Sequence, residues 1–176
     1  MTGTVMKTTT GTVVPPTTMC GMEHHDVFRK NYLVHGLKDE VIDQIETLAT
    51  METTLAREFL VKHGEKSSDL YVILEGTVIV CTPAGDELAQ IGPGSVLGEI
   101  ALVDDQPRSA DAVCKGFVKV AKLPAKELRS FMAKNTDAGF VMLANLSRVL
   151  SNRLRKTDAV VEDLASHPKD AWKHAL

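Results

Sequence analysis

The chain has 176 residues, of which 44% are hydrophobic, and a formal net charge of −3 at pH 7. This length accommodates one domain of the usual size, about 100 to 150 residues, together with extensions. The slightly acidic balance argues against a general nucleic-acid binder, which needs a strongly basic face. No stretch approaches the roughly 18 to 20 apolar residues of a membrane span, and the N-terminus lacks the apolar segment of a signal peptide. We therefore expect a cytoplasmic protein without membrane contact.

The three cysteines, Cys20, Cys81 and Cys114, are odd in number and widely spaced. This spacing indicates neither a disulfide framework nor a Cys-x-x-Cys metal site. His24 and His25 are adjacent but have no third candidate ligand nearby, so we expect solvated side chains and no metal site.

Residues 1–22 are rich in Thr, Gly and Pro and show no helical period, which predicts a disordered N-terminal arm. A short amphipathic helix is expected after Gly36, because Asp39 and Glu40 fit its first turn. Its apolar stripe consists of Val41, Ile42, Ile45 and Leu48.

Residues 54–123 contain short apolar or alternating stretches separated by turn residues. These stretches cover residues 59–61, 70–74, 78–81, 88–91, 110–114 and 117–123. Many short strands at close spacing predict an antiparallel barrel or jelly roll. The expected fold class is therefore mainly β with flanking helices (α+β): a jelly-roll β-roll, a short N-terminal helix and a long C-terminal helix.

Pro124 ends the last expected strand, and a short helix is predicted over residues 126–133. A longer helix is predicted over residues 137–166, with Asn135 or Thr136 as its N-cap. Positions seven apart in this helix form a heptad seam interrupted by one hydroxyl: Leu143, Leu150, Thr157 and Leu164. A helix of about 28 residues is roughly 42 Å long, more than one face of the roll can cover. We therefore expect a homodimer through this helix.

Residues 97–110 carry the clearest chemical signal. Gly98 lets the backbone approach a ligand closely because it has no Cβ, and the Glu99 carboxylate can accept a hydrogen bond from a sugar hydroxyl. Arg108 supplies a planar guanidinium that fits phosphate oxygens, and Ser109 can donate one further bond. This arrangement indicates a site for a small ligand that carries both a sugar hydroxyl and a phosphate.

The same segment resembles the phosphate-binding cassette of the cyclic nucleotide-binding domain family, which includes the bacterial catabolite activator protein and the regulatory subunits of cyclic AMP-dependent kinase. The motifs Gly98-Glu99, Ala101-Leu102 and Pro107-Arg108-Ser109-Ala110 occur in the family's order and spacing. Upstream, residues 61–65 and 69–76 resemble the family's opening hairpin, and Gly92-Pro93-Gly94 resembles its approach to the cassette. The resemblance implies a cyclic nucleotide-binding domain over residues 23–166.

The resemblance also implies roles for single residues: Arg108 binds the phosphate, Glu99 binds the ribose, and Thr157 with its neighbour reaches the adenine. Asp158 departs from the serine that is common there. Ser109, where some relatives have threonine, favours cyclic AMP over cyclic GMP. The expected ligand-binding residues are Leu97, Gly98, Glu99, Ile100, Ala101, Arg108, Ser109, Ala110, Thr157 and Asp158. Four basic residues of the predicted C-terminal helix are expected to form a solvated face, and one of them is able to stack on a purine. They are Arg148, Arg153, Arg155 and Lys156.

The predicted function is a stand-alone cyclic nucleotide sensor that signals to a protein partner by rearranging its C-terminal helix. Only twelve residues follow Leu164, ending in a tail at 167–176, so we expect no helix-turn-helix domain and no DNA binding by this chain alone. A jelly-roll metalloenzyme is not expected, because His63 is the only histidine between Leu37 and Ser166. The alternative is a structural or assembly module that keeps the fold without a ligand.

Overall fold

The structure is a computed structural model that describes residues 20–166 of the chain. It opens with three short helical elements, α1 (Cys20–Lys30), the 3-10 turn η1 (Tyr32–Val34) and α2 (Asp39–Glu46). The predicted helix after Gly36 is α2. The predicted disordered arm over residues 1–22 is wrong at its end, because Cys20 already begins α1. The rest of that arm and the tail at 167–176 lie outside the described residues.

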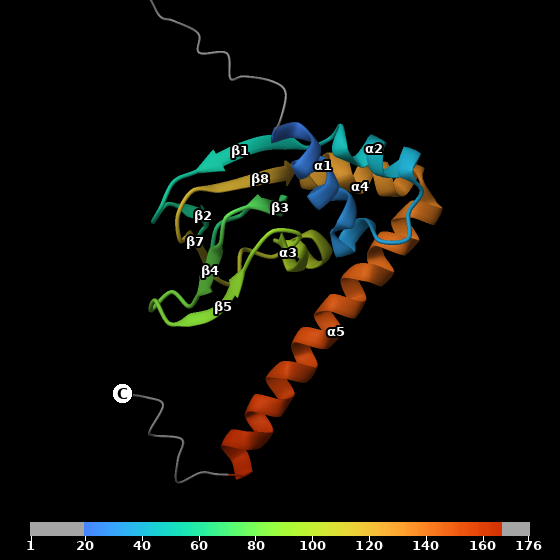
Figure 1. Cartoon of the computed structure of the whole chain (residues 1–176). Helices are drawn as coiled ribbons and strands as arrows, with labels where there is room; N and C mark the ends of the chain where they lie inside the picture. The colour runs from blue at the N-terminus through green and yellow to red at the C-terminus, as the bar shows by residue number, and fades with distance from the viewer. Residues whose placement is uncertain (1–19, 167–176) are drawn as a thin grey trace, which may run out of the picture.

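Eight strands form the β-roll seen in Figure 1, arranged as two four-stranded antiparallel sheets. One sheet has the order β1-β8-β3-β6 and the other β2-β7-β4-β5. The strands are β1 (Thr50–Thr54), β2 (Phe59–Val61), β3 (Leu70–Glu75), β4 (Val78–Cys81), β5 (Glu87–Ile91), β6 (Val96–Leu97), β7 (Asp111–Cys114) and β8 (Val118–Leu123). A helix, α3 (Glu99–Asp104), interrupts the strands between β6 and β7. The predicted β-roll with flanking helices is thus confirmed.

Helix α1 and strands β1 and β6 were not predicted from the sequence. Strand β1 lies at the edge of its sheet and pairs only with β8, from Thr50 opposite Lys122 to Thr54 opposite Val118. It reads Thr-Met-Glu-Thr-Thr and none of its residues is fully buried. An exposed edge strand needs no apolar alternation, so its sequence carries little of the signal on which strand prediction rests.

Two groups of buried residues hold the molecule together. One joins the helices to the first sheet and includes Phe28, Ile45, Leu123 and Leu146. The other fills the roll and is formed by Val61, Tyr71, Ile73, Val78, Ala112, Cys114, Val118 and Val120. Burial of this apolar surface is the main stabilising contribution, at about 25 cal/mol per Å². Helix α3, between β6 and β7, is anchored by its buried residues Ala101 and Leu102, and its first turn lines the candidate site.

Both N-terminal histidines make side-chain contacts, and of the two predicted to be solvated only His25 remains partly exposed. His24 is buried and its Nε2 lies 3.4 Å from a carboxylate oxygen of Glu75 on β3. His25 contacts Glu46 of α2 through Nδ1 at 2.6 Å and accepts a 2.6 Å hydrogen bond from Arg29 Nε at its other ring nitrogen. These contacts attach α1 to both the sheet and α2.

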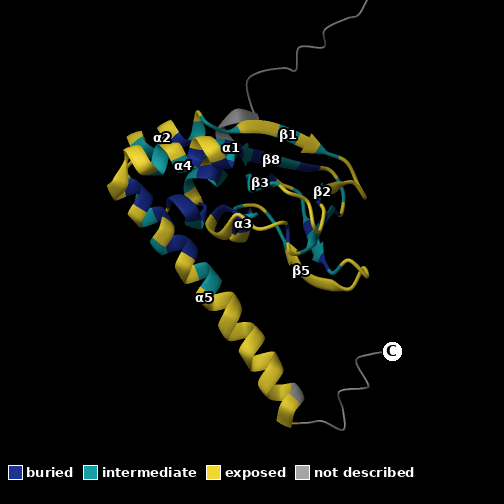
Figure 2. Ribbon diagram, turned by 180° about the vertical axis from the view of Figure 1, so that it is seen from behind, coloured by how far each residue is buried: buried dark blue, intermediate teal, exposed yellow. Residues whose placement is uncertain are grey.

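Two C-terminal helices follow the roll, α4 (Ala125–Lys134) and α5 (Thr136–Ser166), close to the predicted bounds. The first part of α5 packs on the core through Met142 and Leu146, and Asn145 donates hydrogen bonds to the carbonyls of Leu33 and His35. Residues 151–163 are exposed, and Figure 2 shows this half of α5 extending beyond the body of the domain.

Within residues 20–166, no helix combines the length and apolar character that crossing a membrane requires.

Candidate ligand-binding site

A cavity of about 830 Å³ lies between α3, the β2-β7-β4-β5 sheet and the distal half of α5. Of the ten residues predicted to bind a ligand, all except Asp158 line it. They come from β6, α3, the segment before β7 and α5, which are separated in the sequence by up to 60 residues. Asp158 is exposed on α5 and does not line this cavity.

Gly98 makes the first turn of α3 possible. Its φ of +94° is in the left-handed region, where residues with a Cβ are strained. A Cβ at this position would also collide with Arg108 Nη1 and with the backbone carbonyl of Asp69. Glycine is therefore required here twice, by the backbone conformation and by the close approach of the arginine.

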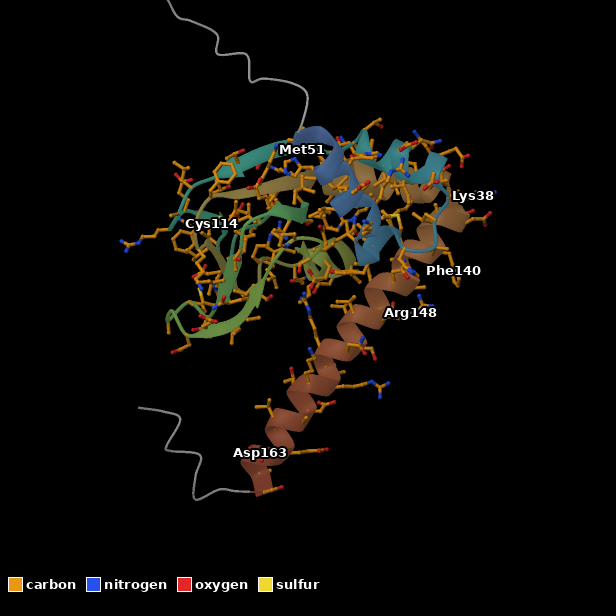
Figure 3. All side chains as sticks on the ribbon, viewed as in Figure 1. Lys38, Met51, Cys114, Phe140, Arg148 and Asp163 are labelled. Carbon is orange, nitrogen blue, oxygen red and sulfur yellow. The ribbon has the colours of Figure 1, made fainter. Side chains whose placement is uncertain are left out.

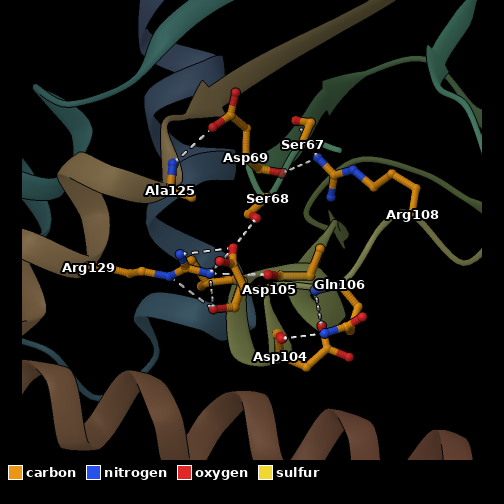
Figure 4. A network of polar contacts seen from close by, with 11 residues as sticks. Ser67, Ser68, Asp69, Asp104, Asp105, Gln106, Arg108, Ala125 and Arg129 are labelled. Atoms are coloured by element: carbon orange, nitrogen blue, oxygen red, sulfur yellow. Dashed lines mark hydrogen bonds and ion pairs between the residues drawn. The ribbon is translucent and has the colours of Figure 1, made fainter. Parts of the chain in front are cut away.

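Arg108 is buried, with 5% of its surface exposed, although it lines the cavity. Its Nη2 donates to Ser67 Oγ at 3.2 Å and to the carbonyl oxygen of Asp69 at 2.7 Å, as Figure 4 shows. Its guanidinium lies 5.8 Å from the ring centroid of Tyr71. Its Nε and Nη1 have no hydrogen-bond partner in the part of the chain that the structure describes.

No carboxylate forms an ion pair with Arg108 within residues 20–166. Burial lowers the pKa of its guanidinium, while nearby Tyr71 and carboxylates act in the opposite direction. A guanidinium stays protonated at neutral pH even so, because its ordinary pKa exceeds about 12. Burying a cation and two N–H donors without a partner is costly, so the geometry fits an anion placed in the cavity.

Glu99 is buried to 1% exposure, and its carboxylate forms an ion pair with Arg153 of α5. Arg153 was expected on a solvated face; its side chain is indeed half-exposed, but it also lines the cavity and pairs with Glu99. The only signal in the sequence was its position one helical turn before Thr157. Thr157 itself lines the cavity, and its hydroxyl donates to the Arg153 carbonyl at 3.2 Å.

The remaining walls of the cavity were not predicted as ligand contacts. Strand β5 contributes most of one wall, and α5 contributes two further residues beside Thr157. These additional residues are Val61, Val80, Glu87, Leu88, Ala89, Gln90, Ile91, Pro107, Asp111, Ala112, Lys156 and Val160. The apolar members of this set offer a surface suited to the flat face of a heterocycle.

Behind the cavity, Arg129 of α4 holds the end of α3. It donates hydrogen bonds to the carbonyls of Ala101 (3.2 Å) and Leu102 (2.8 Å) and to the Asp105 carboxylate (3.1 Å). The bond to Leu102 satisfies a carbonyl of the kind that a helix end leaves without a partner, whereas the Ala101 carbonyl also accepts from the backbone N–H of Asp105 at 3.0 Å. Asp105 also accepts a 2.7 Å bond from the Ser68 hydroxyl, and Figure 4 shows the whole network.

Asp69 connects the arginine of the site to α4. Its carbonyl accepts from Arg108, and its side chain accepts a 3.0 Å bond from the backbone N–H of Ala125, the first residue of α4. A carboxylate at a helix N-terminus is stabilised by the helix dipole. Asp69 thus joins the cavity-lining Arg108 to α4.

One group of described side chains has the spacing of metal ligands, His25, Asp43 and Glu46. None of them lines the cavity, and Arg29 already donates to both His25 and Asp43. The arrangement is an internal ion-pair network between α1 and α2.

Residues 52–135 match the family model of the cyclic nucleotide-binding domain. The chain is 28% identical over 134 residues to Glutaminase 1 of Bradyrhizobium diazoefficiens, covering 76% of this chain and 22% of that protein. It is 29% identical over 124 residues to the cAMP-activated global transcriptional regulator CRP of Haemophilus influenzae, covering 68% of this chain and 55% of the regulator. Its structure resembles that of the Thermus thermophilus Catabolite Activator Protein, with a TM-score of 0.67 and 26% identity, over 77% of this chain and 63% of the other.

Residues 52–135 therefore form a cyclic nucleotide-binding domain, as the cassette residues indicated. The chain spans about a fifth of the glutaminase and about half of the regulator.

Proposed function

We propose that this protein is a regulatory module that binds cyclic AMP, with no catalytic activity of its own. The observation that carries the proposal is the buried Arg108, which lines the cavity and whose Nε and Nη1 have no hydrogen-bond partner among residues 20–166. A cyclic phosphodiester bears a single negative charge, which complements this guanidinium through charge-assisted hydrogen bonds. Relatives named as cAMP-activated regulators support the choice of ligand class.

In this proposal the other parts of the nucleotide occupy the rest of the cavity. The Ser109 hydroxyl adds a donor to the phosphate, and the Glu99 carboxylate accepts from the ribose 2′-hydroxyl. The base lies against the β5 wall, with Thr157 of α5 beside it. Ser109 in place of threonine favours adenine over guanine by family resemblance.

The ion pair between Glu99 and Arg153 supplies a route for the signal. Because the ribose and Arg153 need the same carboxylate, the nucleotide shifts the equilibrium between two arrangements of α5. A ligand changes such an equilibrium only by the difference in its affinity for the two states. A protein partner that binds only one arrangement of α5 then responds to the nucleotide.

We also propose that two copies associate through α5. Residues 151–163 are exposed and include three large apolar side chains, Leu154, Val160 and Val161, each about 60% exposed. Packing against the same helix of a second copy would remove this surface from water.

The experiment that tests the ligand proposal is calorimetric titration of the purified protein, freed of copurified ligand, with cyclic AMP and then with cyclic GMP. We expect binding at micromolar or tighter affinity, about −8 kcal/mol or better, with cyclic AMP preferred. Absence of heat and of a thermal shift with both nucleotides would favour the alternative, a ligand-free assembly module with the same fold.

A further inference from the structure

The backbone of Arg108 is held by the loop that precedes β3. Its N–H donates to the carbonyl of Glu65 at 3.0 Å, and its carbonyl accepts from the N–H of Gly64 at 2.8 Å. These two bonds fix the point at which the arginine side chain leaves the backbone. They leave the orientation of the guanidinium to other contacts.

The guanidinium of Arg108 is held at one of its three nitrogens. Nη2 donates to Ser67 Oγ at 3.2 Å and to the Asp69 carbonyl at 2.7 Å, and the ring centroid of Tyr71 lies 5.8 Å from the guanidinium carbon. Within residues 20–166, Ser67 is the only side chain that hydrogen-bonds this group. Nε and Nη1 have no partner in the same part of the chain. The contacts thus restrain the guanidinium at Nη2 and leave two nitrogens for an anion.

Two adjacent serines before β3 differ in what they contact. Ser67 accepts from Arg108, whereas the Ser68 hydroxyl donates to the Asp105 carboxylate at 2.7 Å; Figure 4 shows these residues. Both serines are partly buried, and neither lines the cavity of the candidate site. Ser67 therefore acts on an anion in that cavity through Arg108, and Ser68 offers a neighbouring hydroxyl without this contact.

We propose that Ser67 is a positioning residue for the phosphate: it holds Nη2 of Arg108 so that Nε and Nη1 keep the orientation that an anion in the cavity requires. This inference rests on the proposed function and names a residue outside the cassette motif. An arginine side chain loses rotamer freedom when it binds, and a side chain that is already restrained loses less. Without the Ser67 hydroxyl, Arg108 keeps only the Asp69 carbonyl as an acceptor, and the nucleotide must order the guanidinium as it binds.

The test titrates the full chain and two variants with cyclic AMP in a calorimeter. Ser67→Ala removes the acceptor and should weaken binding about three- to tenfold, as for the loss of one hydrogen bond. Ser68→Ala is the matched control, because it removes the neighbouring hydroxyl and should leave the affinity within about twofold of the parent. Each variant loses one hydrogen bond of the ligand-free protein, so both melting temperatures should fall by similar small amounts.

A double-mutant cycle separates a positioning role from a purely structural one. In the Arg108→Ala background the hydroxyl has no guanidinium to hold. Adding Ser67→Ala to that background should therefore change the affinity for cyclic AMP by less than about twofold.

Equal losses of affinity for Ser67→Ala and Ser68→Ala would overturn the role of Ser67. So would an effect of Ser67→Ala that persists in full in the Arg108→Ala background, and so would unchanged or tighter binding by Ser67→Ala alone. A parent protein that does not bind cyclic AMP would instead overturn the proposed function, and with it this inference, so the two failures are distinguishable.

Discussion

Arg153 on α5 forms an ion pair with the buried carboxylate of Glu99 on α3, 54 residues earlier in the chain. It ties the exposed half of the long helix to the segment that carries the cassette residues. Figure 3 shows the side chains around this half of α5, which otherwise point into solvent on several sides. The pair is the contact through which the cavity can influence α5.

Replacing Arg153 with Gln should loosen α5 and destabilise the ligand-free protein. Glu99 would remain buried with its charge unpaired, and because Arg153 itself is half-exposed we expect a loss of about 1 to 2 kcal/mol in the free energy of unfolding. Chemical denaturation measures this loss, and hydrogen exchange should quicken over residues 151–163. The matched control is Arg155→Gln, an exposed arginine on the same helix that does not line the cavity. Equal effects of the two substitutions would contradict the importance of the pair.

Arg108→Ala should weaken cyclic AMP binding at least tenfold. A charge-assisted hydrogen bond contributes about 1.5 to 3 kcal/mol, and this residue offers two free donors to the phosphate. Calorimetry measures the affinity, with Arg155→Ala as a control of equal charge change outside the cavity. Affinity equal to that of the parent would show that the phosphate does not bind at Arg108.

Gly98→Ala should abolish tight nucleotide binding, whereas Gly94→Ala should not. Both glycines have positive φ, +94° and +83°, so both substitutions carry the strain of a left-handed alanine, about 1 to 2 kcal/mol. Only at Gly98 does the new Cβ meet Arg108 and the Asp69 carbonyl, while at Gly94 it meets nothing within 4 Å. Titration and thermal melting of both variants separate strain from displacement of the arginine. A normal affinity for the Gly98 variant would mean that Arg108 moves aside without consequence.

The stabilising contribution of ionised Asp105 should be lost when the carboxyl is protonated in acid. Hydrogen bonds from Ser68 and Arg129 hold the pKa of the Asp105 carboxyl below its ordinary value. A carboxyl with a depressed folded pKa contributes stability above its unfolded pKa, about 3.9, and loses it as the pH falls toward the lower folded value. Unfolding free energies measured between pH 5 and pH 3 should therefore fall more steeply for the parent than for Asp105→Asn. Asparagine is the suitable replacement because it tolerates the left-handed conformation of this position, φ +56°. If the free energies of unfolding of the parent and of Asp105→Asn fall in parallel with pH, the Arg129 contact does not contribute to stability.

Leu154→Glu combined with Val161→Glu should convert a dimer into a monomer. Both side chains are exposed in the single chain, so the free energy of unfolding of the monomer should change by less than about 0.5 kcal/mol each. Analytical ultracentrifugation measures the association state. Leu55→Glu, at an equally exposed position after β1, serves as the control and should leave the dimer intact. A parent chain that is already monomeric at all concentrations would contradict the proposed association.

Local pattern was sufficient for much of this protein. Alternating apolar residues and turn glycines predicted most of the roll, and the spacing of Gly98, Glu99 and Arg108 predicted the cassette, because these features depend on neighbours within about a dozen residues. The edge strand β1 escaped prediction, since an exposed edge strand need not alternate. So did α1, whose ordering depends on contacts of His24 and His25 with Glu75 and Glu46.

The sequence by itself determined the repeating elements and the arginine that we propose to bind phosphate, because period and motif spacing are properties of adjacent residues. Only the tertiary structure decided which distant residues meet: Arg153 pairs with Glu99, and Arg129 bonds the end of α3. The Arg153–Glu99 contact joins positions 54 residues apart in the chain, and the Arg129–Leu102 contact joins positions 27 residues apart. Local sequence preferences do not encode partners at such separations. These contacts arise when core packing brings helices and roll together, so the residues that connect the cavity to α5 became visible only in the fold.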